Sequence, residues 1–295
     1  MSVERVALLG GTGLVGRALA ARLARAGVAV RVAARHAETA EGLPEGVTAL
    51  SADVLDAAAM RRAMAECEAA VYLPGLVHGR SRRVFHDVHV RGAQSCADIA
   101  RGLGLKRFVY LSALGAAAGA PAWSDQTKAK GEQEVARAFP GAVVVRPSLV
   151  LGLEDHFSTH MLDLMRRLPV LPVVGPGTRV QPVRIDDLAD ALQSLLQGPL
   201  EAGPVIQAAG PRVWTMIELL EALRERSGVR CRLLGLPEAV AVMLAVVAER
   251  LPESPLCRDQ VRLMRTDKIA DGGLADLTAL GVVPADPLPE SAWRR

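Results

Sequence analysis

Residues 6–16 read VALLGGTGLVG, and the chain continues as RALAARLARAG. A short apolar run gives way to glycines, and the residues that follow have the apolar spacing of a helix. Gly11, Gly13 and Gly16 match the pattern GxGxxG, and Gly10 opens an alternative GxxGxxG spacing. Such glycines permit a tight turn, close approach to a pyrophosphate and close packing of helix on strand. The stretch therefore predicts a strand, a tight turn and a helix whose N-terminus faces phosphates.

This glycine pattern has a structural alternative, in which the turn only joins a buried strand to a helix and no ligand binds. Its surroundings favour nucleotide binding instead. The pattern follows an apolar run, opens a helical pattern and is followed by a second apolar run at residues 28–33. A GxGxxG pattern in this order of elements is typical of dinucleotide binding.

The residue after the second apolar run indicates which nucleotide is bound. The run VAVRVAARH passes through Ala33 and Ala34 to Arg35. Proteins that prefer NAD carry Asp or Glu at this point, where the carboxylate binds the ribose hydroxyls, whereas a guanidinium suits a 2′-phosphate. Arg35 as a solvated residue after a strand is the alternative. We expect NADP(H) rather than NAD(H), because the acid is absent and an arginine stands near its place.

Composition and charge bound the class of protein. The 295 residues are 50% hydrophobic, and 35 basic against 32 acidic residues give a net charge of +3. This excess is too small to indicate nucleic acid, and aromatic residues are only 3% of the chain. The first residues enter an apolar run without the features of a secretory leader. We expect a cytoplasmic protein, or one attached peripherally to the cytoplasmic face of an inner membrane.

The cysteines and histidines predict no metal site. The cysteines form no CxxC pair and are expected to be reduced and buried; they are Cys67, Cys96, Cys231 and Cys257. His156 and His160 share one face of a predicted helix, but the segment lacks the glutamate of HExxH. A zinc site would also need a third converging ligand.

Apolar runs alternate with helical patterns along the first two thirds of the chain. They lie at residues 6–9, 28–33, 47–50, 69–73, 108–111 and 142–145. Continuous rather than alternating apolar strands indicate a parallel sheet covered on both faces. We therefore expect an α/β fold with a doubly wound parallel sheet, the NAD(P)-binding Rossmann architecture, and a small C-terminal appendage.

The pattern loosens after Arg146, where prolines and glycines cluster. Such segments form loops over a cleft more often than they form core. We expect residues 1–150 to form the nucleotide-binding domain, with residues 180–200 returning to it. Residues 151–179 and 201–295 are expected to form a lid and a smaller domain for a substrate or partner.

Several segments resemble one family in order. They are GGTGLVG at residues 10–16, HVRGA at 89–93, RPSLVLGLEDHF at 146–157, LPVVGPGTRVQPVRIDDLADAL at 171–192 and PLCRDQVRLMRTDKIA at 255–270. The chain resembles an atypical, extended short-chain dehydrogenase/reductase of the NAD(P)-dependent epimerase/dehydratase superfamily. It is most similar to the family of the nucleotide-binding accessory subunit of respiratory complex I, alpha subcomplex subunit 9, and its bacterial relatives. The likeness covers nearly the whole chain, and the last three segments are its most specific part.

The resemblance implies a set of cofactor contacts. Glycines of the first turn would line the pyrophosphate, Arg35 would bind the 2′-phosphate and Asp53 the adenine, although an Asp at a strand end is equally an ordinary helix cap. Lys128 would bind the nicotinamide ribose. The complete set is Gly10, Thr12, Gly13, Leu14, Val15, Gly16, Arg35, Asp53, Val54, Leu73, Lys128, Pro147 and Ser148.

The catalytic residues of the family are only partly retained. Ser112 follows the fifth apolar run, where short-chain enzymes place a serine that orients the substrate carbonyl, and Lys128 stands where they carry the lysine of a YxxxK pair. The tyrosine position is Ser124, and the two tyrosines of the chain, Tyr72 and Tyr110, lie in predicted strands. A serine hydroxyl is far less acidic than a phenol and donates a proton poorly to a developing alkoxide.

Two functional classes follow. The resemblance and the missing tyrosine favour an accessory or assembly protein with a structural NADP(H), linked to respiratory complex I or quinone metabolism. The alternative is an active reductase, dehydrogenase or epimerase of a small or lipid-like carbonyl compound, with Ser112 and Lys128 as catalytic residues. In the first class, the C-terminal region would bind a respiratory or quinone-related partner.

A C-terminal segment, AVAVMLAVVA at residues 239–248, is apolar on every face and too short to span a bilayer. The plain interpretation is a helix buried in the core. The alternative is a surface that meets a membrane or partner, because arginines flank it; they are Arg224, Arg226, Arg230, Arg232, Arg250, Arg258, Arg262 and Arg265.

Overall fold

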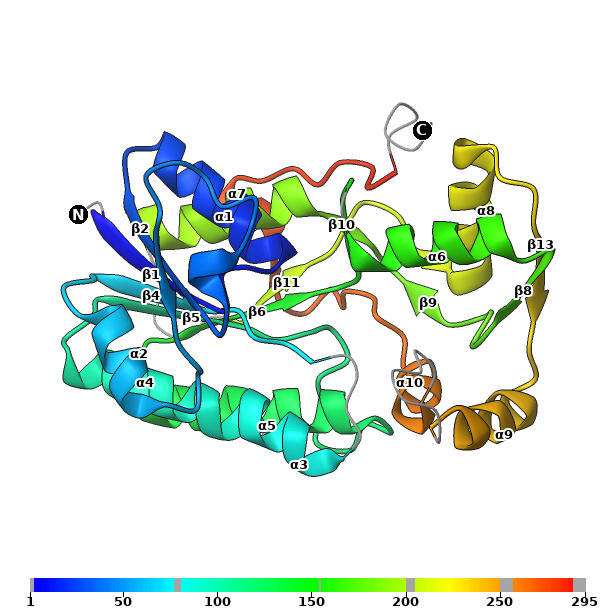
Figure 1. Cartoon of the computed structure of the whole chain (residues 1–295), viewed down its shortest axis with the longest axis horizontal. Helices are drawn as coiled ribbons and strands as arrows, with labels where there is room; N and C mark the ends of the chain where they lie inside the picture. Colours follow the sequence, from blue (N-terminus) through cyan, green and yellow to red (C-terminus); the bar gives the residue numbers. More distant parts are fainter. Residues whose placement is uncertain (1–2, 77–80, 154, 200–204, 250–256, 289–295) are drawn as a thin grey trace.

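An eight-stranded parallel sheet forms the centre of the molecule (Figure 1). The computed structural model describes residues 3–76, 81–153, 155–199, 205–249 and 257–288. The sheet has the order β14-β11-β6-β5-β4-β1-β2-β3. Its strands are β1 (Arg5–Leu9), β2 (Ala29–Ala34), β3 (Thr48–Ser51), β4 (Ala69–Tyr72), β5 (Arg107–Leu111), β6 (Val143–Pro147), β11 (Val205–Ala208) and β14 (Ala275–Asp276). The predicted doubly wound parallel sheet is confirmed.

Helices cover both faces of this sheet, which explains the continuous apolar runs of its strands. Figure 1 shows α1 (Leu14–Arg25) and α7 (Ile185–Gln197) on one face. The opposite face is covered by α2 (Ala57–Met64), α4 (Ala93–Gly102) and α5 (Trp123–Ala138).

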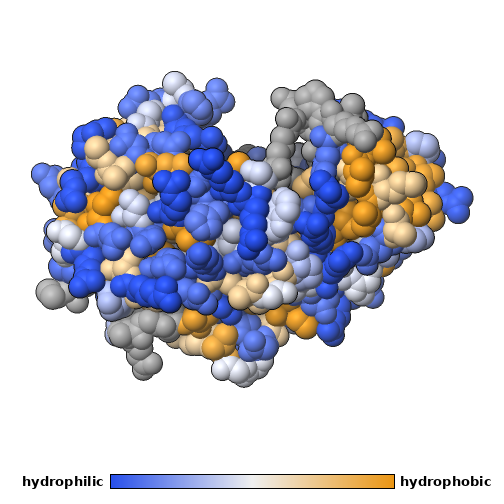
Figure 2. Space-filling model, turned by 90° about the horizontal axis from the view of Figure 1, so that it is seen from below, coloured by the Kyte–Doolittle hydropathy of each residue, from blue (hydrophilic) through white to orange (hydrophobic). Residues whose placement is uncertain are grey.

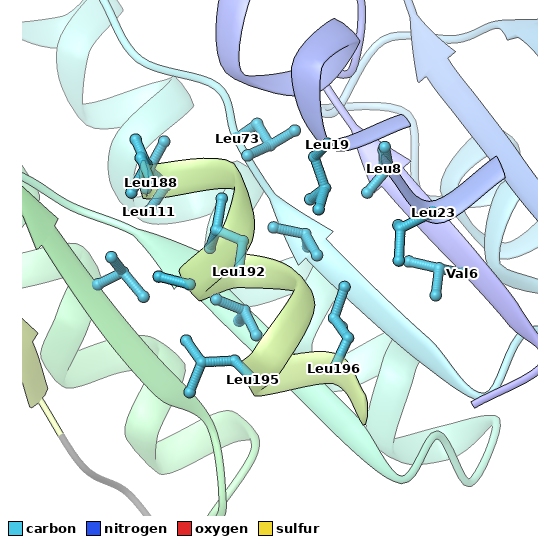
Figure 3. Close-up of a cluster of buried hydrophobic side chains, with 14 of the residues drawn as sticks. Val6, Leu8, Leu19, Leu23, Leu73, Leu111, Leu188, Leu192, Leu195 and Leu196 are labelled. Atoms are coloured by element: carbon cyan, nitrogen blue, oxygen red, sulfur yellow. The ribbon is translucent and has the colours of Figure 1, made fainter. Parts of the chain in front are cut away.

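Leucines of α7 pack onto the sheet and against α1, which lies beside α7 on the same face (Figure 3). Leu188, Leu192, Leu195 and Leu196 are all almost completely buried. Burying one such side chain contributes roughly 1.5–3 kcal/mol relative to its exposure. This packing fixes α1, and with it the position of the helix N-terminus that follows the glycine turn.

The helix after β4 contains a π-helical turn. α3 (Arg82–His86) continues through the π segment Asp87–Gly92 into α4. Two buried tyrosines of the sheet meet this turn: the Tyr72 hydroxyl donates to the Val88 carbonyl at 2.6 Å, and the Tyr110 hydroxyl donates to the His89 carbonyl at 3.0 Å. Wider π turns disturb the usual helical hydrogen bonds, and π turns often lie at functional sites. Both tyrosines therefore hold the helix that carries His89.

A second core lies beyond the carboxyl edge of the sheet. It is formed by α6 (His156–Arg167), α8 (Met216–Ser227) and the parallel pair of β8 (Val170–Val173) with β13 (Arg232–Gly235). Two more short pairs join this core to the main sheet: β7 (Val150–Leu151) with β10 (Val183–Arg184), and β9 (Arg179–Val180) with β12 (Trp214–Thr215).

The chain also returns to the main sheet after residue 200, in addition to the return over residues 180–200 that the sequence predicts. Residues 201–295 were expected in the smaller domain, yet β11 and β14 extend the eight-stranded sheet, and η3 (Leu277–Leu280) packs beside α7. β14 holds only two residues, too few for a period to be recognised in the sequence.

The apolar C-terminal helix is largely exposed, so its interpretation as a buried core helix is wrong. α9 (Glu238–Ala248) buries only its small side chains, Ala241 and Ala245, which pack against Val261 of α10 (Arg258–Leu263). Its large side chains are exposed by 61% at Met243, 40% at Leu244, 40% at Val246 and 57% at Val247. Figure 2 shows a cluster of hydrophobic side chains on this part of the surface. Among the described residues, no helix is long and apolar enough to cross a membrane.

Candidate nucleotide-binding site

The glycine turn between β1 and α1 requires glycine for three different reasons. Gly10 adopts φ +77°, and its backbone N–H donates to the Ala33 carbonyl at 2.7 Å. A Cβ atom on Gly16 would lie 2.3 Å from the Gly11 carbonyl oxygen, so a side chain there would force α1 away from the turn. A Cβ atom on Gly13 would meet only the Gly10 carbonyl oxygen, at 3.8 Å. Gly13 therefore leaves open space above the turn, as approach of a pyrophosphate requires.

The N-terminus of α1 suits an anion. Gly13 is its N-cap, no side chain caps the first turn, and that turn holds no acidic residue. The first backbone N–H groups of a helix lack intrahelical partners and carry partial positive charge. Thr12, Leu14 and Val15 surround this point, and the Arg17 guanidinium donates to the Thr12 carbonyl at 3.1 Å. The turn is therefore shaped and charged to hold phosphates.

The strand order brings further predicted residues to the same edge. β3, β2, β1 and β4 are neighbours, so their carboxyl ends lie in a row. Arg35 is exposed beyond β2, Asp53 is exposed beyond β3, and Leu73 follows β4 with 9% exposure. Asp53 accepts a hydrogen bond from the Leu55 N–H at 2.9 Å, while the N-cap of α2 is Asp56. Asp53 thus stabilises the loop before α2 and does not cap the helix.

Lys128 lies at the floor of this edge. Its ammonium donates to the Leu111 carbonyl at 2.6 Å and to the Pro74 carbonyl at 3.2 Å, and it lies 5.1 Å from the centre of the Tyr110 ring. Burial lowers the pKa of Lys128 to about 7, against the opposing effect of the Glu132 carboxylate. The lysine is therefore fixed between the ends of β4 and β5, where a ribose would meet it.

The two serines near Lys128 face different surroundings. The Ser124 hydroxyl is buried and has no hydrogen-bond partner among the described residues. The Ser112 hydroxyl donates to the Glu132 carboxylate at 2.5 Å, and Glu132 accepts two hydrogen bonds from Arg146, at 2.9 and 2.6 Å. Ser112 is thus engaged in a buried ionic network beneath α5, and its catalytic role stays a prediction. No phenol stands at the position of Ser124.

His89, on the π segment after α3, connects two of the elements around Lys128. Its Nε2 accepts the Leu76 N–H at 2.9 Å, so the neutral ring carries its proton on Nδ1 and donates to Thr127 Oγ1 at 2.9 Å. Burial lowers the pKa of His89 to about 2, assisted by the nearby Lys128 ammonium, and this keeps the ring neutral. His89 thereby ties the loop after β4 to α5, the two elements that hold Lys128.

Lys268, in the C-terminal segment, contacts the end of β6 and the first turn of α5. The Ser148 hydroxyl donates to the Lys268 carbonyl at 2.7 Å, and Lys268 forms an ion pair with the buried Asp125 carboxylate at 2.5 Å. Pro147 is buried beside Ser148 at the end of β6. Sequence reasoning missed Lys268 and Asp125, because 143 residues separate them and neither belongs to a local motif.

Candidate metal ligands do not gather in the described part of the chain. No group of three or more His, Cys, Asp or Glu side chains is positioned there to hold a metal ion. His156 and His160 lie on α6 with both side chains exposed.

This geometry defines an NAD(P)-binding Rossmann protein, and comparison with known proteins agrees. A family model described as NAD(P)H-binding matches residues 10–143. A solved structure titled NADPH-dependent quinone oxidoreductase QOR2 complexed with NADPH, from Escherichia coli, superposes with a TM-score of 0.74. It is 21% identical, and the match covers 97% of this chain and 98% of that one, so the likeness is one of fold.

Two curated relatives define the family more closely. Alpha subcomplex subunit 9 of NADH dehydrogenase [ubiquinone] 1 from Dictyostelium discoideum is 26% identical, over 97% of this chain and 82% of that protein. A protein named ceramide reductase from Caulobacter vibrioides is 30% identical, over 79% of this chain and 74% of that protein. The chain belongs to the family of atypical short-chain dehydrogenase/reductase-like proteins that includes both relatives, as its sequence segments predicted.

Lys128 predicts a specific pH dependence of stability. Its pKa is about 7 in the folded chain against an ordinary value of 10.5. Between these values the unfolded chain binds a proton that the folded chain lacks, so the free energy of unfolding rises with pH over this range. We expect Lys128→Met to reduce that rise, measured by urea unfolding between pH 7 and pH 10. Lys130→Met, on the exposed face of α5, serves as the control and should keep the wild-type slope. Equal slopes in both variants would contradict the buried, proton-losing lysine.

Proposed function

We propose that this protein is an NADP(H)-binding accessory or assembly protein in which the nucleotide stabilises the fold and is not turned over. The proposal rests on one observation: the chain keeps the lysine of the YxxxK pair, Lys128, but lacks the tyrosine that would act as the proton donor. Lys128 is held by two backbone carbonyls, while Ser124 stands in place of the tyrosine and Ser112 is engaged by Glu132. A hydride acceptor would therefore lack the phenol that supplies its proton.

The relatives support a link to respiratory metabolism. Complex I subunits of three kingdoms match 94–97% of this chain at 26–27% identity. Since these relatives are named as subunits of a respiratory complex, we infer that this chain acts with complex I or with quinone metabolism, through a partner that its C-terminal region contacts.

Gly13 allows a direct test of the structural role. Because a Cβ atom there meets nothing closer than 3.8 Å, Gly13→Val leaves the turn itself unstrained but fills the space that a pyrophosphate needs. We expect NADPH to raise the melting temperature of the wild-type protein and to leave that of Gly13→Val unchanged, measured by differential scanning calorimetry.

The control for this test is Gly119→Val, at an open loop position with no atom within 4 Å of its Cβ. This variant should keep the wild-type response to NADPH. A Gly13→Val protein stabilised by NADPH as strongly as the wild type would refute the nucleotide site.

Arg35 supports the preference for NADP(H). It is the exposed residue directly beyond β2, beside the strand ends that flank the glycine turn. We expect Arg35→Ser to weaken NADPH binding by roughly tenfold or more, as for loss of a charge-assisted pair, while NADH binding changes little. Fluorescence titration with NADPH and with NADH gives the two Kd values, and their ratio measures the preference. An unchanged ratio would contradict the assignment of Arg35 to the 2′-phosphate.

The alternative function is reduction of a lipid-like carbonyl compound. It is favoured by the 30% identity to the protein named ceramide reductase and by the buried Lys128, whose pKa of about 7 lets it take part in proton transfer near neutral pH. Steady NADPH oxidation on addition of a long-chain ketone, lost in Lys128→Met, would establish this alternative.

We further propose that α9 attaches the protein peripherally to an anionic membrane surface. β13 precedes α9 in the chain; its Leu234 is 56% exposed, and Arg230 and Arg232, before and at the start of that strand, are exposed as well. An apolar helix flanked by arginines suits the interface of an anionic bilayer, where the arginines meet lipid phosphates.

Two exposed side chains of α9 test this contact. We expect the double variant Met243→Asp/Val247→Asp to lose binding to phosphatidylglycerol-containing vesicles by about tenfold or more in a sedimentation assay, because both apolar side chains leave the interface. Val283→Asp is the matched control, since Val283 is 82% exposed on another part of the surface. Equal vesicle binding by all three proteins would refute the membrane contact, and copurification with a protein partner through α9 would replace it.

A further inference from the structure

The helix that carries Lys128 begins without a cap of its own. The N-cap position of α5 is Ala122, whose side chain accepts no hydrogen bond. The first residues of a helix have backbone N–H groups with no intrahelical partner, and leaving such groups buried and unpaired is costly. The first turn of α5 is buried at Ser124 and Asp125, so water cannot satisfy these groups there.

A distant residue supplies the missing cap. The Asp259 carboxylate of α10 accepts the Trp123 N–H at 2.8 Å and the Ser124 N–H at 3.4 Å. Asp259 is 4% exposed, and 136 residues separate it from Trp123. A carboxylate at a helix N-terminus is also favoured by the helix dipole. Asp259 therefore does for α5 what a local Asp or Ser does for other helices.

The α9–α10 pair fixes the position of Asp259. Val261 of α10 packs between Ala241 and Ala245 of α9. Ion pairs join Arg258 to Glu249 and Arg265 to Glu238, near the two ends of α9. The Arg262 guanidinium lies 5.1 Å from the centre of the Trp123 ring. These contacts between α9 and α10 hold Asp259 at the N-terminus of α5.

A second carboxylate lies near Asp259 at this junction. Burial raises the pKa of Asp125, in the first turn of α5, and the charge of Asp259 raises it further. The Lys268 ammonium pairs with Asp125 and opposes this effect. The C-terminal segment therefore contributes the Asp259 carboxylate, which accepts backbone N–H groups of α5, and the Lys268 ammonium, which pairs with Asp125.

We propose that Asp259 is a positioning residue of the nucleotide site. It fixes the first turn of α5, and Lys128 lies one turn further on the same face, four residues after Ser124. Displacement of this turn would move the Lys128 ammonium from the carbonyls of Leu111 and Pro74. By reciprocity, a nucleotide held by Lys128 strengthens the contact of α10 with α5. The inference rests on the proposed binding of NADP(H).

The test compares two Asp259 variants with a cap removed elsewhere. Asp259→Ala removes both acceptors, and Asp259→Asn keeps one neutral acceptor as a milder change. Thr215→Ala removes the N-cap of α8, in the second core, and is the matched control for loss of a helix cap. We expect Asp259→Ala to raise the Kd for NADPH about five- to tenfold, the range of a lost cap, and Asp259→Asn to fall between it and the wild type. Thr215→Ala should lower the melting temperature and leave the Kd within about twofold of the wild type.

Hydrogen exchange supplies a readout that a merely stabilising role would not move. NADPH should slow the exchange of the α10 amides in the wild type and in Thr215→Ala, and should have little effect on them in Asp259→Ala. An unchanged Kd and unchanged protection in both Asp259 variants would overturn the inference while leaving nucleotide binding intact. If Asp259→Ala does not fold, the comparison of Asp259→Asn with Thr215→Ala decides the matter. A wild-type protein that fails to bind NADPH would contradict the proposed function itself.

Discussion

A side chain at Gly16 would place its Cβ 2.3 Å from the carbonyl oxygen of Gly11, and this close approach of α1 to the turn after β1 is the constraint on which the rest depends. It directs the N-terminus of α1 over the carboxyl edge of the sheet. α1 in turn offers its apolar face to the leucines of α7, which bring residues 185–197 back onto the sheet (Figure 3). The nucleotide site and the main core thus share one geometric origin.

The carboxyl edge of the main sheet has the features of a cofactor site but lacks the tyrosine that serves as proton donor in related enzymes. Under the proposed function, the glycines, Arg35 and Lys128 would meet the phosphates and ribose of a dinucleotide, as in an enzyme of this fold. At Ser124, however, a short hydroxyl without a hydrogen-bond partner stands where a phenol is needed. The polar groups near the lysine are occupied in holding α5, through Glu132, His89 and Asp259. These contacts are the basis of the proposal that the nucleotide stabilises the fold and is not turned over.

The sequence predicts well what neighbouring residues determine. The apolar runs identify the first six strands because the central ones are buried on both faces, and the glycine spacing locates the turn. Long-range contacts lie beyond such reasoning: Asp259 and Lys268 reach α5 across 136 and 143 residues. The exposure of α9 could not be predicted from the sequence either. A helix that is apolar on every face has the same pattern whether the core buries all of its side chains or, as in α9, only its alanines. β14, with two residues, is too short to carry a periodic signal.

Nucleotide content tests the central claim most directly. The protein would be purified without added nucleotide and unfolded, and the released compounds would be identified and counted by mass spectrometry. The structural role predicts close to one NADP(H) per chain, retained through purification, because a nucleotide that stabilises the fold dissociates slowly. An empty protein that binds added NADP(H) rapidly and reversibly would contradict it and would favour an enzyme.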